Sequence, residues 1–302
     1  MMSAQPHADE SAWTIKRLLT WTSEYLGGQG VEETRLAAEV LLAHATDRRR
    51  IDLYARPEDV PDAMQVEKFR GLVKLAANHE PIAYLVGVKE FLSLSFKVTR
   101  DVLIPRPETE TLVEAVVDYC RERTLARPRL VDIGTGSGCI AVAILTQLKN
   151  AKVVATDISQ EALDVASENA ARHGVSDRFE AVPADRLALP TEVVPSGGFD
   201  VLMSNPPYVT QEEWSELPAN VRDCEPTLAL TDGADGLSFY RSIASDGPEL
   251  SASDGAVVVE IGDGQADRAR DLLEIHGHYR QVRRVADTVT GRDRVLVLSR
   301  VT

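Results

Sequence analysis

Leu130-Val-Asp-Ile-Gly-Thr-Gly-Ser-Gly-Cys139 is the stretch that decides the fold, because an apolar-rich strand runs directly into a glycine-rich turn. We expect a strand at Leu130–Ile133 and a helix near Cys139–Leu148. Glycine allows the tight backbone that joins the two, and it lets a ligand approach the amide groups at the helix N-terminus. A glycine-rich turn by itself does not identify that ligand.

The alternation of strand and helix continues to the end of the chain. It predicts an α/β fold with a doubly wound, largely parallel sheet of seven strands. The last two strands are joined by a loop around Gly291 that is too short for a parallel crossover, so the final strand is expected to run antiparallel. The other expected strands are Val153–Asp157, Phe179–Val182, Val201–Asn205, Ala256–Ile261, Tyr279–Ala286 and Arg294–Leu298, and the other expected helices are Gln160–His173, Leu237–Leu250 and Gln265–His276.

Upstream of this region the hydrophobic period is helical. Apolar residues recur at spacings of three and four, which predicts a small all-α helical bundle over residues 1–88. The Trp13/Trp21 pair is expected in the core of this bundle and not as a base-stacking platform. Between Glu90 and Ile104 the period changes to two, so residues 89–104 are expected to form a β-hairpin linker. Pro105-Arg-Pro107 then starts a helix that continues through Cys120, and residues 105–302 form the third part.

Composition and charge exclude several classes of protein. The chain has 302 residues, of which 44% are hydrophobic and 26% charged, as in a globular protein. Its longest apolar run, Cys139–Leu145, is too short for a membrane span, and Met1–Ser11 lacks the apolar core of a secretory signal, so we expect a cytoplasmic protein. The three cysteines form no Cys-x-x-Cys pair, which argues against a disulfide framework and a zinc site. A formal charge of −14 opposes nonspecific binding to nucleic acid or to an anionic membrane.

Two details of the glycine turn distinguish between classes of nucleotide. A dinucleotide site needs Gly-x-Gly-x-x-Gly, whereas here the third glycine, Gly138, comes one residue early. The acid Asp132 completes Asp-x-Gly-x-Gly-x-Gly, the turn found in S-adenosylmethionine enzymes. Asp157 ends the next strand, where a carboxylate can accept hydrogen bonds from both ribose hydroxyls of a nicotinamide or an adenosylmethionine cofactor. We therefore favour ribose binding over helix capping for Asp157.

Ser204-Asn-Pro-Pro-Tyr208 is the most specific local signal in the chain, and it ends the fourth strand. Two prolines fix the backbone and remove two donors, which leaves carbonyl oxygens and the Asn205 amide oxygen free to accept. Such a cluster of acceptors suits a planar NH2 group, because it takes both N–H hydrogens and points the nitrogen face at an electrophile. A simple proline turn does not explain an asparagine at the carboxyl edge of the sheet, beside the glycine turn.

These residues resemble one family, the peptide chain release factor N5-glutamine methyltransferases, which are class I S-adenosylmethionine-dependent enzymes. The resemblance covers nearly the whole chain. Asn-Pro-Pro-Tyr alone is shared with DNA and RNA amino-methyltransferases, but its combination with the motif at Ile104–Glu110 and the helical amino-terminal bundle is much narrower. The motifs that carry the resemblance are Pro81-Ile-Ala-Tyr-Leu-Val-Gly87, Glu90-Phe91, Leu103-Ile-Pro-Arg-Pro-Glu-Thr-Glu110, the Asp132–Gly138 turn, Asp157, Asn205-Pro-Pro-Tyr208, Glu225-Pro-Thr-Leu-Ala-Leu230 and Gly291-Arg-Asp-Arg-Val295.

The resemblance implies a Rossmann-like class I methyltransferase fold and a set of site residues. Asp157 would hold the cofactor ribose, Asp185 and Arg186 would border the adenine, and Asn205 would also lie at the cofactor. Asn205 and the Pro206 carbonyl would hold the substrate amide. The methionine side of the cofactor would be lined by Gly134, Thr135, Gly136, Ser137 and Gly138, the substrate would also meet Pro207 and Tyr208, and a linker closing over the cleft would supply Phe91, Arg106 and Glu108.

The implied reaction is methyl transfer from S-adenosylmethionine to the glutamine of the Gly-Gly-Gln motif in class I peptide chain release factors, by a monomeric enzyme that needs no metal. The helical bundle would recognise the partner, and no membrane or direct DNA binding is expected. The alternative is an enzyme that methylates adenine N6 or cytosine N4 in DNA or RNA after flipping the base. The charge of −14 opposes it. A non-enzymatic adenosylmethionine sensor would leave the acceptors of Asn205-Pro-Pro-Tyr208 without a task.

Overall fold

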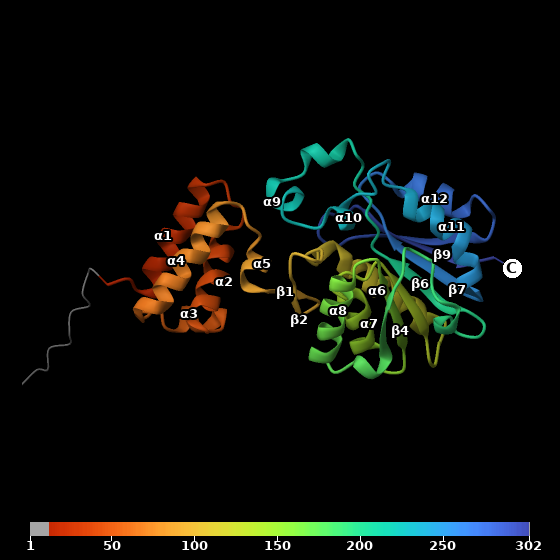
Figure 1. Cartoon of the computed structure of the whole chain (residues 1–302), viewed down its shortest axis with the longest axis horizontal. Coiled ribbons are helices and arrows are strands. Elements are labelled where there is room, and N and C mark those ends of the chain that lie inside the picture. The colour runs from red at the N-terminus through yellow and green to blue at the C-terminus, as the bar shows by residue number, and fades with distance from the viewer. Residues whose placement is uncertain (1–11, 302) are drawn as a thin grey trace, which may run out of the picture. The chain divides into compact units, whose positions relative to one another are not determined.

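The chain divides into two compact units, one ending at Gly87 and the other beginning at Val88. The structure is a computed structural model that describes residues 12–301 (Figure 1). The expectation that Met1–Ser11 carries no secretory signal lies outside the described residues. None of the helices between residues 12 and 301 is long and apolar enough to cross a membrane.

The first unit is an all-helical bundle, as predicted. Its hydrophobic core is built from apolar residues spaced three and four apart on each helix, such as Leu18, Leu19 and Leu26. Asp62 and Gln65 form a reciprocal capping box at the start of the fourth helix. The described helices are α1 (Ile15–Gly28), α2 (Thr34–Thr46), α3 (Arg50–Ala55), α4 (Ala63–Ala77) and α5 (Ile82–Val86).

The prediction that Trp13 and Trp21 lie in the bundle core is wrong. Their exposed fractions are 43% and 47%, because the buried residues of α1 occupy the other side of the helix. Trp21 stacks on Tyr25 with ring centres 5.0 Å apart, and Trp13 meets Trp21 edge-on at 6.2 Å. The first unit therefore carries a row of exposed aromatic rings, formed by Trp13 just before α1 and by Trp21 and Tyr25 on α1.

The second unit begins with the predicted β-hairpin, formed by β1 (Val88–Phe91) and β2 (Leu94–Lys97). Asn169 on helix α8 (Gln160–Arg172) fastens this hairpin to the rest of the unit. Its Oδ1 accepts from the Lys97 amide at 2.7 Å, and its Nδ2 donates to the carbonyls of Lys97 and Ser137 at 3.0 and 2.9 Å. The hairpin and the glycine turn are thus tied through one buried side chain.

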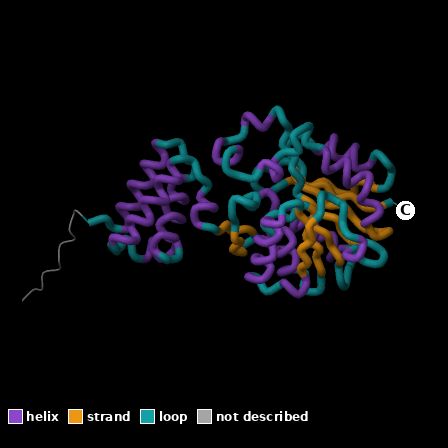
Figure 2. Tube along the Cα trace, viewed as in Figure 1, coloured by secondary structure: helices purple, strands orange, loops and turns teal. Residues whose placement is uncertain are grey.

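The predicted seven-stranded sheet is confirmed, and its strands gather in the second unit (Figure 2). Their order across the sheet is β5-β4-β3-β6-β7-β9-β8. Pairs from β5 to β7 are parallel, and β9 runs antiparallel to both β7 and β8, as the short loop at Gly291 predicts. The strands are β3 (Arg129–Ile133), β4 (Lys152–Asp157), β5 (Phe179–Pro183), β6 (Phe199–Ser204), β7 (Ser251–Glu260), β8 (Tyr279–Ala286) and β9 (Asp293–Arg300).

Helices cover both faces of this sheet, and each face has its own hydrophobic core. Along β6, Val201 and Met203 belong to one core and Leu202 to the other, as expected for a strand buried on both sides. One core contains α6 (Glu110–Glu122), α7 (Cys139–Gln147) and part of α8, and the other contains α11 (Ser238–Leu250) and α12 (Ala266–Glu274). The shorter helices are η1 (Pro107–Thr109), η2 (Ser176–Arg178), η3 (Thr191–Val193), η4 (Glu213–Glu216), α9 (Ala219–Arg222) and α10 (Thr227–Leu230).

Strand β7 is longer than predicted and begins at Ser251, not at Ala256. Its first pairing joins Ser251 to Phe199, and its next joins Ala256 to Val201, so the extra residues form an irregularity in the ladder. Sequence periodicity does not reveal such a register shift, because the pairing is with a distant strand. The irregularity lies at the start of β6, far along the strand from the site. At the other end β6 and β7 run side by side to Ser204 and Glu260.

Strand β3 lies between β4 and β6, so the chain turns to one side of β3 first and to the other side later. Ligands of open α/β sheets bind at such a point, in the crevice outside the carboxyl ends of the strands. The glycine turn follows β3, Asp157 ends β4 and Asn205 follows β6. The topology therefore brings the three predicted elements to one edge.

Candidate active site

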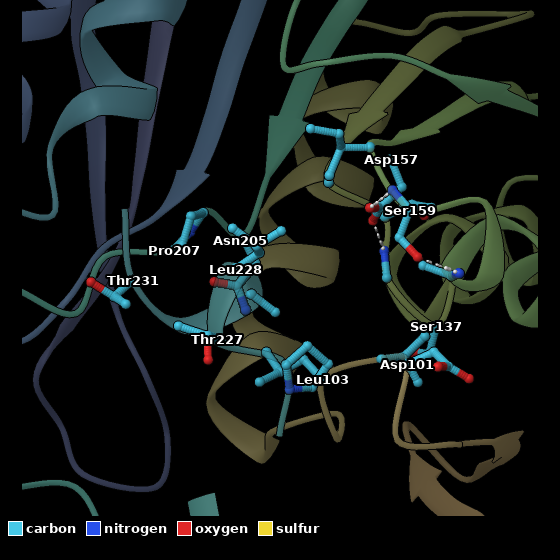
Figure 3. Close-up of a pocket in the computed structure, with 18 of the residues that line it drawn as sticks. Asp101, Leu103, Ser137, Asp157, Ser159, Asn205, Pro207, Thr227, Leu228 and Thr231 are labelled. Carbon is cyan, nitrogen blue, oxygen red and sulfur yellow. Dashed lines mark hydrogen bonds between the residues drawn. The ribbon is translucent and has the colours of Figure 1, made fainter. Parts of the chain in front are cut away.

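A cavity of about 900 Å³ opens at this edge of the sheet. Figure 3 shows Asp157 and Ser159 on one side of it and Asn205 and Pro207 on the other. Of the predicted site residues, those that line the cavity are Gly134, Thr135, Gly136, Ser137, Asp157, Asp185, Arg186, Asn205, Pro207 and Arg106. Its volume is in the range of sites for drug-sized ligands and cofactors.

The glycines of the turn divide into two kinds. Gly134, Gly136 and Gly138 all have positive φ, at 74°, 53° and 76°. A Cβ on Gly134 or Gly136 would meet no atom within 4 Å, so both face open space on the cavity side. A Cβ on Gly138 would lie 3.0 Å from the Cβ of Ala166 on α8, and Gly138 does not line the cavity. The first two glycines leave room for a ligand, and the third allows close helix packing.

Asp157 holds the turn in place from the end of β4. Its Oδ2 accepts from the Gly136 amide at 2.9 Å, and its Oδ1 accepts from the Ser159 amide at 3.0 Å. Because a carboxylate oxygen has two lone pairs, each oxygen can accept one further hydrogen bond. The half-buried side chain lines the cavity and can therefore receive a pair of ligand hydroxyls.

Asp132 lies beneath the turn and is completely buried. Thr135 donates to its Oδ2 at 2.7 Å, while its Oδ1 has no hydrogen-bond partner within the described part of the chain. Burial raises the pKa of Asp132 to about 7, and the nearby Asp157 charge acts in the same direction, although the Thr135 hydrogen bond opposes both. Two acids under one side of the cavity favour a cationic ligand there.

Asn205 directly follows β6, because the strand ends at Ser204, one residue before its predicted end. Its Nδ2 donates to the Thr109 hydroxyl at 3.2 Å, which leaves Oδ1 able to accept from a ligand. Pro207 lines the cavity beside it, whereas Pro206 is buried and does not. Tyr208 points away from the cavity and donates from its hydroxyl to Oε1 of Glu260 at 3.2 Å.

The predicted linker residues lie in different places. Phe91 does not reach the cleft, because it is 1% exposed and packs against Phe96 in the core below the hairpin, with ring centres 6.0 Å apart. Glu108 is half-buried but does not line the cavity. Arg106 does line it, and its Nη2 is 2.5 Å from Oε1 of the buried Glu225.

Glu225 organises the wall of the cavity through contacts that the sequence did not reveal. Its second oxygen, Oε2, accepts from the Ile104 amide at 3.1 Å, so one carboxylate ties both Ile104 and Arg106 to the segment after Asn205-Pro-Pro-Tyr208. The motif Glu225-Pro-Thr-Leu-Ala-Leu230 marks this position in the sequence. It does not indicate which residues Glu225 contacts, because they lie more than a hundred positions away. This ion pair holds the linker along the wall of the cavity.

Phe239 is a second residue that sequence reasoning missed. It lies near the start of α11 and lines the cavity together with Asp185 and Arg186. The Arg186 guanidinium lies 5.4 Å from the centre of the Phe239 ring, in a cation–π contact. This pair forms a flat boundary to the cavity at the carboxyl end of β5. Between residues 12 and 301 no group of three or more His, Cys, Asp or Glu side chains is placed to hold a metal ion.

Comparison with known proteins agrees with this geometry. The family model for the PrmC N-terminal domain matches residues 17–87, and that for the methyltransferase small domain matches residues 109–220. A release factor glutamine methyltransferase from Rhodopirellula baltica is 39% identical over 97% of this chain and 98% of its own length. The chain belongs to the release factor glutamine methyltransferase family.

A further relative supports this assignment, and one solved structure shows the same fold. The release factor glutamine methyltransferase of Geobacter sulfurreducens is 40% identical over 88% of this chain and 90% of its own length. Among solved structures, the hMettl16 catalytic domain in complex with a 3′UTR hairpin matches with a TM-score of 0.55 and 17% identity, over 92% of this chain and 91% of its own. That likeness shows the shared class I methyltransferase fold.

The two kinds of glycine lead to a prediction about stability. We expect Gly138→Ala to destabilise the protein more than Gly134→Ala. Both changes impose a positive φ on a side chain, at about 1–2 kcal/mol, but only Gly138→Ala also forces a methyl group against Ala166, at about 1–3 kcal/mol more. Urea denaturation of the two variants measures the difference, and equal losses would contradict the assigned packing role of Gly138.

Proposed function

We propose that this protein transfers a methyl group from S-adenosylmethionine to the side-chain amide nitrogen of the glutamine in the Gly-Gly-Gln motif of class I peptide chain release factors. The observation that carries the proposal is the orientation of Asn205 at the cavity. The Nδ2 of Asn205 donates to the Thr109 hydroxyl, so the Oδ1 of Asn205 remains free to accept a hydrogen bond from an NH2 group. In this proposal the protein acts as a monomer in the cytoplasm and does not bind DNA.

The cavity fits S-adenosylmethionine as methyl donor. Gly134 and Gly136 leave open space over the turn, and the unpartnered Oδ1 of Asp132 lies beneath it. The negative charge favours the ammonium and sulfonium groups of this cofactor. In this proposal Thr135 and Ser137 border its methionine part, Asp157 holds the ribose, and Asp185, Arg186 and Phe239 border the adenine. When bound, S-adenosylmethionine supplies a methyl group on a positively charged sulfur.

Asn205 would act on the substrate together with the backbone carbonyl of Pro206, whose ring is buried but which lies between the cavity-lining residues Asn205 and Pro207. A glutamine amide is a poor nucleophile, because its nitrogen lone pair is delocalised into the carbonyl. The Oδ1 of Asn205 and the Pro206 carbonyl would accept the two N–H groups, orient the amide and return electron density to the nitrogen. Pro207 and Tyr208 keep this segment of backbone rigid, since the first fixes its φ and the second is held by hydrogen bonds to Glu260 and Gln265.

Partner recognition and catalysis would belong to different parts of the chain. We assign partner recognition to the helical bundle, residues 1–88, and catalysis to residues 105–302, with residues 89–104 between them. The aromatic row of Trp13, Trp21 and Tyr25 supports this assignment, because such a row of exposed rings is unusual for a surface that meets only water. Their rings can cover an apolar patch on the release factor.

A methyl-transfer assay tests the proposed function. S-adenosylmethionine carrying a labelled methyl group is offered with an intact release factor, with the same factor lacking its motif glutamine, and with duplex and single-stranded DNA. We expect label only in the intact release factor, on the glutamine nitrogen. Label in DNA instead of the release factor would favour the adenine or cytosine enzyme, and equal label in both release factors would refute the assigned acceptor.

We expect Asn205→Ala to lower kcat by a factor on the order of 10²–10³, the scale for removing one preorganised hydrogen bond to a transition state. The N–H that Asn205 accepts becomes more acidic as positive charge develops on nitrogen, so this hydrogen bond strengthens along the reaction. The affinity for S-adenosylmethionine, measured by calorimetry, should change little. Turnover near that of the wild type, in a folded variant, would contradict the role of Asn205.

Trp21→Ala should raise the KM for intact release factor about tenfold or more, since buried tryptophans often dominate interfaces. The kcat at saturation and the affinity for S-adenosylmethionine should stay as in the wild type. Met64→Ala is the matched control, because Met64 is exposed on α4 of the same bundle and is not part of the aromatic row. Equal KM values for the two variants would show that the aromatic row does not meet the partner.

A further inference from the structure

One wall of the cavity is lined by residues to which the proposed reaction assigns no use. Figure 3 shows Leu228 on the side of Asn205, across the cavity from Asp157. In the proposed function Asp157 holds the cofactor ribose, whereas Asn205 holds the substrate amide. The wall at Leu228 therefore faces the substrate and not the cofactor.

Leu228 is an exposed apolar side chain on a fixed support. It lies on α10, and its exposed fraction is 72%. The end of α10 is held by the Val209 amide, which donates to the Leu230 carbonyl at 2.9 Å. Just before α10, the buried carboxylate of Glu225 accepts from the Arg106 guanidinium. Because both ends of the helix are fixed, the apolar surface of Leu228 stays at the cavity, where a ligand can cover it.

Arg106 lines the same cavity and has hydrogen-bond donors to spare. A guanidinium carries five N–H donors. Within residues 12–301, Nη2 is the only nitrogen of this side chain that has a hydrogen-bond partner, which is Oε1 of Glu225. The side chain is 32% exposed, so a ligand reaches it only by coming close to the wall. Thr109, three residues further on, hydrogen-bonds to Asn205 and keeps this part of the chain next to the place of the substrate amide.

The charge of the Arg106–Glu225 pair selects the kind of ligand. Glu225 is buried, and its negative charge offsets that of Arg106, so the wall is close to neutral. Such a wall is compatible with a sulfonium in the same cavity, and it offers little attraction to an anion such as a phosphate. The remaining N–H donors of Arg106 therefore suit a neutral acceptor. In a protein substrate, main-chain carbonyl oxygens are the most abundant groups of this kind.

We propose that Arg106 and Leu228 form a substrate wall, which binds the main chain of the segment that carries the acceptor glutamine. Arg106 donates to a main-chain carbonyl oxygen, and Leu228 covers the apolar surface of the same segment. This inference rests on the proposed function of the site. Because Arg106 is recessed, a bulky side chain next to the glutamine would hold the carbonyl away from it. The substrate wall therefore selects glycine beside the glutamine.

Steady-state kinetics with intact release factor and saturating S-adenosylmethionine test the substrate wall in the full chain. Leu228→Ala should raise KM about tenfold, since apolar contact of a leucine side chain is lost. The kcat should stay within about twofold, because the contact is the same in the bound substrate and in the transition state. Ile275→Ala is the matched control, since Ile275 is exposed to a similar degree in the same unit and does not line the cavity. Equal KM values for the two variants would overturn the proposal.

Two changes test Arg106. Arg106→Lys keeps the charge beside Glu225 but loses the planar fork of donors, so KM should rise about 10- to 100-fold, as for the loss of one hydrogen bond to a charged group. Arg106→Met combined with Glu225→Gln removes the donors without leaving a buried charge unpaired, and it should show the same rise. Thermal unfolding establishes that each protein is folded, and the affinity for S-adenosylmethionine should stay within about twofold. A wild-type KM in either folded protein would overturn the proposal.

A double-mutant cycle connects Arg106 with the glycine of the substrate. A release factor with alanine in place of the glycine next to the glutamine should lose kcat/KM with the wild-type enzyme. With Arg106→Lys the same change in the substrate should cost about tenfold less, because the hydrogen bond that it disturbs is already lost. Two losses that simply multiply would overturn the proposed contact.

A binding measurement separates this inference from the proposed function. Calorimetry of the release factor with the enzyme and S-adenosylhomocysteine, the demethylated cofactor, requires no turnover. Weaker binding by Leu228→Ala and Arg106→Lys, without methyl transfer by the wild type, would refute the proposed function and support the substrate wall. Methyl transfer by the wild type, with unchanged binding in both variants, would overturn the substrate wall and leave the proposed function intact.

Discussion

Backbone hydrogen bonds between β3 and its two parallel neighbours, β4 and β6, set the register on which the whole site depends. Asp132 is opposite Ala155 on one side and Met203 on the other, so all three strands end at the same level. The glycine turn, Asp157 and Asn205 are thereby brought to one cavity. A shift of one residue in either pairing would turn alternate side chains to the opposite face of the sheet.

Two acids, Asp132 near the end of β3 and Glu260 at the end of β7, are buried at the carboxyl edge of the sheet. Burial raises both pKa values to about 7, so each carboxyl binds its proton more firmly in the folded protein than in the unfolded chain. The stability that this confers is fully present below the ordinary carboxyl pKa, and it is lost as the pH rises through 7. A fold that retains both acids therefore gives up stability at neutral pH for charge beside its ligands, as is common where a site needs perturbed groups.

The wall of the cavity depends on contacts between segments far apart in the chain. The Glu225 carboxylate accepts hydrogen bonds from the Ile104 amide and the Arg106 guanidinium. The hydroxyl of Thr109, three residues after Arg106, accepts from the Asn205 amide. The residues from Ile104 to Thr109 are thereby fixed to two segments that follow β6. The Arg106–Glu225 ion pair makes one of these contacts, and the amide of Asn205, which would hold the substrate, makes the other. Because Glu225 is buried and Arg106 only partly exposed, the pair is screened less than a surface ion pair and can keep its geometry.

The sequence by itself determined the elements and indicated most of the residues that meet at the cavity, because the signals for these are local. Hydrophobic period, the glycines after β3 and the prolines after Asn205 act over a few residues, and they were sufficient to predict the helical bundle, the hairpin, the seven strands and the antiparallel end. Only the tertiary structure decided which side chains meet. It placed Phe91 in the core and Trp21 at the surface, brought Phe239 to the cavity, paired Glu225 with Arg106 at the cavity wall, and joined Asn205 to Thr109. These outcomes depend on pairings across dozens of residues, such as the 96 positions between Thr109 and Asn205, and no periodicity within one segment encodes them.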